Sequence, residues 1–276
     1  KTYRDSINLM QTVYIDRATN GFKDFIKKWS ITPESMIKAI AKYPKFYNSI
    51  KQNTFKVKNS DSTIKEIVEN FRAIYPGFKD KRVCFFIGNM NVGGTVSDNF
   101  LLIGTEIMAA TQFNDLSELN PSFKEMFKDN VNVVQEIKKL VAHEYVHTQQ
   151  TDQYDEEAII CPLLYDTLQE GIADFIGELI SDVKLNSEMY SYGDKHEAEL
   201  WEDFKNELCN TVSDNWLFNG EIKDKPSDLG YYIGYKIAEE YMKNAENKDE
   251  AIIEMIEMND PIRFLQKSNY DQKKKQ

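Results

Sequence analysis

Apolar residues recur three or four positions apart along much of the chain, which is the spacing of a helix with one buried face. The strongest example predicts a helix over residues 129–150. Its apolar positions are Val131, Val134, Ile137, Val141 and Tyr145. Similar patterns predict helices within residues 1–50 and over 62–75, 195–209, 227–245 and 248–258.

Two shorter apolar runs are typical of strands, because they are rich in aromatic and β-branched residues and end near turn residues. They occupy residues 83–87 and 100–103, and residues 91–99 between them are expected to form a glycine-containing loop. The sequence therefore predicts an α+β fold that is mostly α-helical, with a small β-sheet beside the 129–150 helix.

A length of 276 residues fits one domain over residues 1–276, or two lobes around a cleft. The lobes would be a helical N-terminal region, residues 1–80, and a second region, residues 81–268. Residues 269–276 are rich in Lys and Gln, so a flexible tail is expected there.

Composition excludes several classes of function. The net charge of −11 argues against nucleic-acid binding, which requires a basic face. No apolar run approaches the length that spans a membrane, so no transmembrane segment is expected. The three cysteines, Cys84, Cys161 and Cys209, do not make a disulfide framework, and Cys84 fits the core side of a strand.

The candidate chemistry begins with the sequence His143-Glu144-Tyr145-Val146-His147, which lies inside the predicted 129–150 helix. Residues four apart share one helix face, so both imidazoles can reach one metal ion. The glutamate between them can then act on a water molecule at that metal. This pattern is the signature of a zinc peptidase, with His143 and His147 as ligands and Glu144 as the general base.

A catalytic zinc site needs a third protein ligand and leaves one position open. The metzincin pattern requires Gly at position 150 and His at 153, and Gln occupies both positions, so that class is excluded. Glu170 is the next candidate. It lies on a predicted return helix that begins near Pro162, which suits a first helical turn.

Asp174 lies one helical turn after Glu170 and shares its face. Asp174 is expected to accept the spare N–H of a ligand histidine and so to fix the tautomer of that histidine. An alternative remains open, since Glu170, Asp174 and Glu178 also form an acidic stripe of the kind that faces solvent. The remaining histidine, His196, fits a polar surface position.

The combination of HExxH with a later ExxxD resembles the gluzincin class of zinc peptidases. The surrounding sequence is closer to one branch of that class, the predicted Zn-dependent proteases related to gliding-motility lipoproteins of Bacteroidetes-type bacteria. The similar segments together cover about residues 83–245. They are residues 87–95, 102–106, 143–149, 170–175 and 228–235.

The resemblance implies a zincin-like fold in which an edge strand pairs with the backbone of a peptide substrate. The segment that would do so contains Gly93, Gly94 and Thr95; an ordinary hairpin is the alternative. Tyr231, on the predicted 227–245 helix, is the first candidate to stabilise negative charge on the substrate oxygen. Tyr231 also fits a purely packing role.

We therefore expect zinc-dependent hydrolysis of peptide bonds, with a peptide or protein as substrate. Two alternatives remain open: a non-catalytic, zinc-stabilised binding or assembly module for cell-envelope proteins, and a metal-free helical scaffold. Glu144 favours the enzyme, because a purely structural zinc site needs no general base. The resemblance also implies export to the periplasm or cell envelope, with a lipid anchor outside the given sequence.

Overall fold

The computed structural model describes residues 2–128, 130–150, 160–184, 188–220 and 225–273. It divides into two compact units. Unit 1 contains residues 1–66 and 80–144, and unit 2 contains residues 67–79 and 145–276. The division passes through two helices, α5 (Asp61–Ile74) and α8 (Val133–His147).

Unit 1 combines helices with the sheet, as the apolar pattern predicted. Its N-terminal part holds four α-helices, a short π-helix and a 3-10 helix, and two further short helices follow the sheet. The α-helices are α1 (Tyr3–Met10), α2 (Asn20–Lys28), α3 (Pro33–Lys42), α4 (Pro44–Thr54), α6 (Thr105–Met108) and α7 (Pro121–Phe127), the π-helix is Gln11–Ile15 and the 3-10 helix is Phe55–Asn59.

The sheet has three strands, β1 (Arg82–Phe86), β2 (Gly94–Val96) and β3 (Phe100–Gly104), in the order β1-β3-β2. β1 runs parallel to β3, and β2 runs antiparallel to it. The structure therefore differs from a simple hairpin of the two predicted strands. β2 lies inside the segment expected to be a loop, because three residues are too short to show strand periodicity. β2 is an edge strand.

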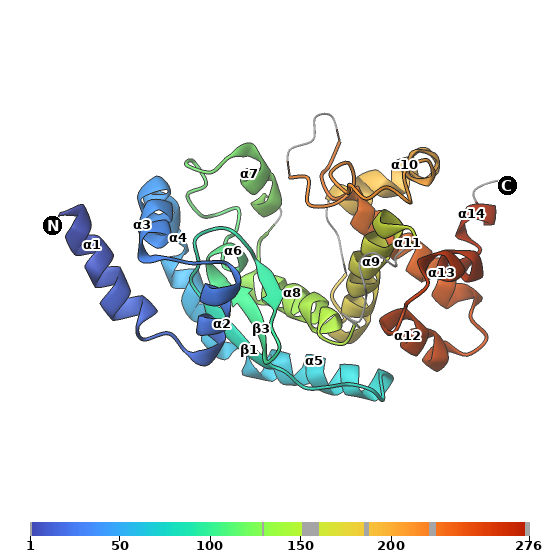
Figure 1. Ribbon diagram of the computed structural model, residues 1–276, viewed down its shortest axis with the longest axis horizontal. Helices are drawn as coiled ribbons and strands as arrows, with labels where there is room; N and C mark the ends of the chain where they lie inside the picture. The colour runs from blue at the N-terminus through green and yellow to red at the C-terminus, as the bar shows by residue number, and fades with distance from the viewer. Residues whose placement is uncertain (1, 129, 151–159, 185–187, 221–224, 274–276) are drawn as a thin grey trace. The chain divides into compact units, whose positions relative to one another are not determined.

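One hydrophobic core of unit 1 forms where α2 packs on β1 and β3 (Figure 1). All five residues of β3 are buried, since this strand is central in the sheet. Phe22 and Phe25 of α2 stack near Phe86 of β1, with ring centroids 5.4 and 4.0 Å from it. This packing fixes the sheet that carries β2.

The segment between β1 and β2 is held by a buried carboxylate. Glu106, in α6, is 1% exposed. Its Oε2 accepts the Gly88 N–H at 2.7 Å, and its Oε1 accepts the Met90 N–H at 3.2 Å. The Tyr14 hydroxyl contributes a third contact, 2.6 Å from the carbonyl oxygen of Ile87. The path into β2 is thus set by side chains from distant parts of unit 1.

Glu106 should make stability depend on pH. Burial raises its pKa to about 7, and the hydrogen bonds from Gly88 and Met90 offset part of that rise. The pKa of this carboxyl is higher in the folded protein, about 7, than in the unfolded chain, about 4.5. Its contribution to the free energy of unfolding is therefore fully present below pH 4.5 and is lost as the pH rises through about 7. The loss is about 3 kcal/mol.

Glu106→Gln should remove this dependence of the free energy of unfolding on pH. The free energy of unfolding, measured with urea at several pH values, should fall less between pH 4.5 and 7 in the variant than in wild type. Glu34→Gln, at an exposed position in α3, is the control and should retain the wild-type slope. Parallel pH profiles for wild type and Glu106→Gln would contradict the assignment.

Unit 2 is helical in its described residues. Its long helices are α9 (Pro162–Ser181), α10 (Glu188–Lys205) and α11 (Leu229–Asn244), and α11 packs along α9. α9 begins at Pro162 as predicted, whereas α10 begins earlier than the 195–209 helix expected. Three shorter helices follow, and they are α12 (Lys248–Ile256), α13 (Pro261–Ser268) and α14 (Tyr270–Lys273).

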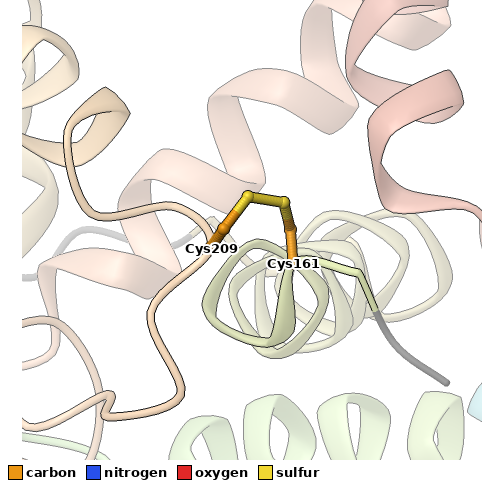
Figure 2. The surroundings of a disulfide bond; sticks show 2 residues. All are labelled: Cys161 and Cys209. Atoms are coloured by element: carbon orange, nitrogen blue, oxygen red, sulfur yellow. A yellow bond between two sulfur atoms is a disulfide. The ribbon is translucent and has the colours of Figure 1, made fainter. Parts of the chain in front are cut away.

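A disulfide joins Cys161, immediately before α9, to Cys209, after the end of α10 (Figure 2). The backbone continues the connection, because the Leu163 and Leu164 N–H groups donate to the carbonyls of Asn210 and Leu208. The number of cysteines did not predict a disulfide framework. The structure contains one disulfide, between Cys161 and Cys209. It ties the start of α9 to the segment after α10.

α14 lies in the stretch for which composition predicted a flexible tail. Tyr270 is fully buried, and its hydroxyl lies 3.0 Å from Glu197 Oε1 in α10. Its ring also packs edge-on against Trp201. A single aromatic residue therefore orders a segment whose overall composition is polar; residues 274–276 lie outside the described part of the chain.

Across the described ranges, no helix combines the length and the apolar character needed to cross a lipid bilayer.

Candidate metal centre

α8 carries the HExxH sequence in its last two turns. The predicted helix over 129–150 is confirmed in its central part, though its buried face differs from the expected one. Val131 and Val134 are exposed, while Val133, Ile137 and Val141 are buried. Position 129 lies outside the described residues. The helix ends at His147, so the histidine pair lies at its C-terminal end.

Two of the three candidate ligands come from α8 and the third from α9. His143 and His147 are one helical turn apart, and His147 Nε2 lies 3.2 Å from Glu170 Oε2. One ligand atom from each of His143, His147 and Glu170 lies within 4.8 Å of the other two. All three are partly buried. The residues that spacing selected as ligands therefore form one cluster.

Gln150 contacts both sides of this cluster. Gln150 is 7% exposed and lies three residues after His147, where α8 ends. The Oε1 atom lies 2.7 Å from His147 Nδ1, and the Nε2 atom donates to the carbonyl of Gln169 at 2.9 Å. The partner found at His147 Nδ1 is thus Gln150, whereas the sequence had suggested Asp174 for a ligand histidine.

The acidic stripe of α9 does not face solvent. Each carboxylate accepts a hydrogen bond from a tyrosine hydroxyl. Tyr190 Oη lies 2.6 Å from Asp174 Oδ2, and Tyr235 Oη lies 2.7 Å from Glu178 Oε2. Tyr231 makes the corresponding side-chain hydrogen bond to Glu170.

Glu178 has a second partner besides Tyr235. Its side chain is 8% exposed and also pairs with Lys184 at 2.8 Å. A buried carboxylate with two partners is costly to remove. Glu178→Ala should therefore lower the free energy of unfolding, which urea denaturation measures.

Tyr231 approaches Glu170 from α11. Burial, followed by the negative charges of Glu170 and Asp174, raises the pKa of Tyr231 well above its usual value. The hydroxyl therefore keeps its proton and remains a hydrogen-bond donor throughout the neutral pH range. The ring packs edge-on against Phe218, with centroids 6.4 Å apart. Tyr235, one turn later in α11, bonds to Glu178 instead.

Two glycines allow α9 and α11 to approach this closely. Gly171, next to Glu170, meets the backbone of Gly234, and a Cβ added to either residue would overlap backbone atoms of the other helix. Gly234 follows Tyr231 by three residues, so the same helix crossing presents Tyr231 to Glu170. Position 171 therefore requires glycine, because any side chain there would collide with the backbone of α11.

Glu144 contacts the edge strand within unit 1. Its side chain is 8% exposed and lies against Gly94, where an added Cβ would come within 2.7 Å of Glu144 Cγ. Gly93 precedes Gly94 and accepts the Gly104 N–H through its carbonyl at 2.8 Å. Thr95 pairs with Leu102 in β3. The glycine sequence therefore lets β2 pass directly beside the predicted general base.

Sequence reasoning missed Gln150 and Tyr190. Gln150 was considered only as the residue that excludes metzincins, and a glutamine three residues after a ligand histidine is no recognised signal. Tyr190 follows residues 185–187, which are outside the described residues. Its hydrogen bond to Asp174 depends on how α10 packs against α9, which the sequence does not display. His196, the third histidine, lies apart from the cluster in α10, where it stacks on Tyr192 and pairs with Glu199.

Comparison with known proteins gives one family. Residues 106–260, more than half of the chain, match the model of a family described as Predicted Zn-dependent protease (DUF2268). The matched range contains His143, Glu144, His147 and Glu170. No curated protein and no solved structure matches the chain. The chain therefore belongs to the family of predicted Zn-dependent proteases.

Proposed function

We propose that this protein is a gluzincin-type zinc peptidase that hydrolyses peptide bonds. In this proposal His143, His147 and Glu170 bind zinc, and Glu144 acts as the general base. The observation that carries the proposal is the close approach of one ligand atom from each of the three residues, all within 4.8 Å, in a chain of a predicted zinc-protease family.

The chemistry of the ligand set fits zinc. Two ligand atoms that are each about 2.1 Å from a tetrahedral zinc lie about 3.4 Å apart. His147 Nε2 and Glu170 Oε2 are 3.2 Å apart, which is close to that value. Two imidazoles and one carboxylate also match the set found in catalytic zinc sites, where a fourth position is left for water or substrate.

Zinc, when bound, supplies a Lewis acid that polarises the scissile carbonyl and makes water more acidic. Glu144 takes the proton from the attacking water and then gives it to the leaving amine. Contact with Gly94 holds the Glu144 side chain in place. Tyr231 is proposed to donate a hydrogen bond to the substrate oxygen as negative charge develops, since its hydroxyl keeps its proton.

The edge strand β2 is proposed to bind the backbone of the substrate. Residues of an antiparallel strand alternate in direction, so when Gly93 and Thr95 bond to β3, the N–H and C=O of Gly94 point to the other edge. An extended peptide can add there as a further strand. Because β2 passes beside Glu144, that peptide would lie next to the base.

Asp174 retains its proposed role as a hydrogen-bond acceptor for a ligand imidazole. With Gln150 at His147 Nδ1, the ligand that remains for Asp174 is His143. The Tyr190 hydroxyl at 2.6 Å would then hold the carboxylate in position. Partners of this kind typically contribute about 10- to 100-fold in metal affinity or activity.

We also propose that the protein is exported. A disulfide between Cys161 and Cys209 is typical of an oxidising compartment. The resemblance to predicted Zn-dependent proteases related to gliding-motility lipoproteins adds the cell envelope as the proposed location.

Metal removal tests the proposed function. Wild-type protein should hydrolyse members of a broad peptide library, lose this activity after dialysis against a chelator, and regain it when one equivalent of zinc is added. His147→Ala should regain nothing under the same conditions. Hydrolysis that survives complete metal removal would contradict the mechanism. Stoichiometric zinc without hydrolysis of any peptide would favour the non-catalytic binding module.

A further inference from the structure

The side chain of Gln150 has hydrogen bonds both to a candidate ligand and to the helix that carries another. Its amide reaches His147 at the end of α8 and the carbonyl of Gln169 in α9. Gln169 immediately precedes Glu170. A 7%-exposed amide with both ends bonded has one fixed orientation and little freedom to move.

The two contacts determine which way the amide points. A carbonyl oxygen can only accept, so the NH₂ group of Gln150 must face Gln169. The Oε1 atom then faces His147 Nδ1, and this ring nitrogen must carry the hydrogen. Consequently His147 Nε2 is left with a lone pair, and Nε2 is the atom that lies 3.2 Å from Glu170 Oε2.

We propose that Gln150 is a positioning residue for the metal centre: it selects the Nδ1–H tautomer of His147 and ties that imidazole to the turn of α9 that bears Glu170. This inference rests on the proposed zinc site. For His147, it assigns to an amide the kind of contact that the sequence suggested for a carboxylate; Asp174 remains the proposed acceptor for His143.

The neighbouring residue offers a matched comparison. Gln149 is 8% exposed, and its amide also makes two bonds to the backbone, with the Lys79 N–H at 2.7 Å and the Lys79 carbonyl at 2.8 Å. These contacts hold the segment before β1 and involve no candidate ligand. Substituting either glutamine removes buried hydrogen bonds, but only Gln150 contacts the imidazole of His147.

Imidazole nitrogen NMR of the metal-free protein tests the tautomer, and the chain has only three histidines to assign. The protein carries Glu170→Ala for this measurement, because an ionised Glu170 at 3.2 Å from Nε2 would itself favour hydrogen on that nitrogen. At a pH where the rings are neutral, this background should show hydrogen on His147 Nδ1. Gln150→Met keeps the volume and removes both hydrogen bonds, so His147 should shift towards the Nε2–H form that free imidazole prefers. Gln150→Glu keeps an acceptor for His147 and should preserve the Nδ1–H form. Gln149→Met should also leave the tautomer unchanged.

Zinc affinity, measured by competition with a chelator, gives the second result. Gln150→Met should weaken zinc binding about 10- to 100-fold. Gln149→Met should weaken it less than about threefold, and the Gln150→Glu value should lie between the two. An unchanged tautomer and affinity in Gln150→Met, or equal losses in Gln149→Met, would overturn the inference. Absence of zinc binding by wild type would instead contradict the proposed function, and the tautomer result would still decide whether Gln150 orients His147.

Discussion

Replacing Glu144 with glutamine should lower the rate of peptide hydrolysis by about 10²- to 10⁴-fold, the usual contribution of a general base. Glutamine has nearly the same shape as glutamate, so the contact with Gly94 should persist. Bound zinc should also persist, because the candidate ligands are His143, His147 and Glu170. The loss should appear in kcat, with little change in KM.

The control for this variant is Glu136→Gln. Glu136 lies two turns earlier in α8 and forms an ion pair with Lys139 at 3.1 Å. An ion pair of this kind contributes little, so hydrolysis should be unchanged. Wild-type turnover by Glu144→Gln would remove Glu144 from the mechanism, while loss of zinc from that variant would mean that Glu144 helps to hold the metal.

The second large effect is expected at the crossing of α9 and α11. Gly234→Ala would improve helix propensity by about 1 kcal/mol if nothing touched the new methyl group. In the structure that methyl group would overlap the carbonyl oxygen of Thr167, a backbone atom that cannot rotate away. Overpacking typically costs about 1–3 kcal/mol, and rigid backbone on both sides places this site at the upper end.

We therefore expect Gly234→Ala to lower the free energy of unfolding by about 2 kcal/mol, measured by urea denaturation. Gly93→Ala is the comparison, because a Cβ there would meet Ile107 at an ordinary 3.4 Å. Its effect should be smaller than about 1 kcal/mol. Stabilisation by Gly234→Ala would mean that propensity outweighs the steric contact, and that α9 and α11 do not cross at these glycines.

The cluster of candidate ligands could be predicted because it depends on local geometry. Four-residue spacing places His143 and His147 on one helix face whatever surrounds that helix. Glu170 required only a return helix, and Pro162 supplied its start. These inferences use periodicities that a single sequence displays directly.

Other features depend on contacts between distant segments and leave no local signal. The buried state of the α9 carboxylates requires tyrosines from α10 and α11, so an acidic stripe looked solvent-exposed in the sequence. The Gln150 contacts depend on the path of the chain after α8. The pairing of Cys161 with Cys209 joins residues 48 positions apart, and three cysteines alone allow several pairings.

Strand β2 illustrates a third limit. Its three residues include a glycine and cannot display alternation, whereas β3 is recognisable because it is apolar and central. Its place at the edge of the sheet follows from pairing with β3, which is a tertiary interaction. The resemblance to gluzincins suggested an edge strand in this segment, and the residue pattern alone favoured a loop.

The most direct test of the account is to locate the metal. Crystals of the purified chain, grown without added chelator, should show one anomalous peak at the zinc absorption edge for each molecule. The peak should lie about 2.0–2.2 Å from a ring nitrogen of His143, a ring nitrogen of His147 and a carboxylate oxygen of Glu170, with no fourth protein ligand. A zinc ion bound elsewhere, or a site closed by a fourth protein ligand, would contradict the proposed peptidase centre.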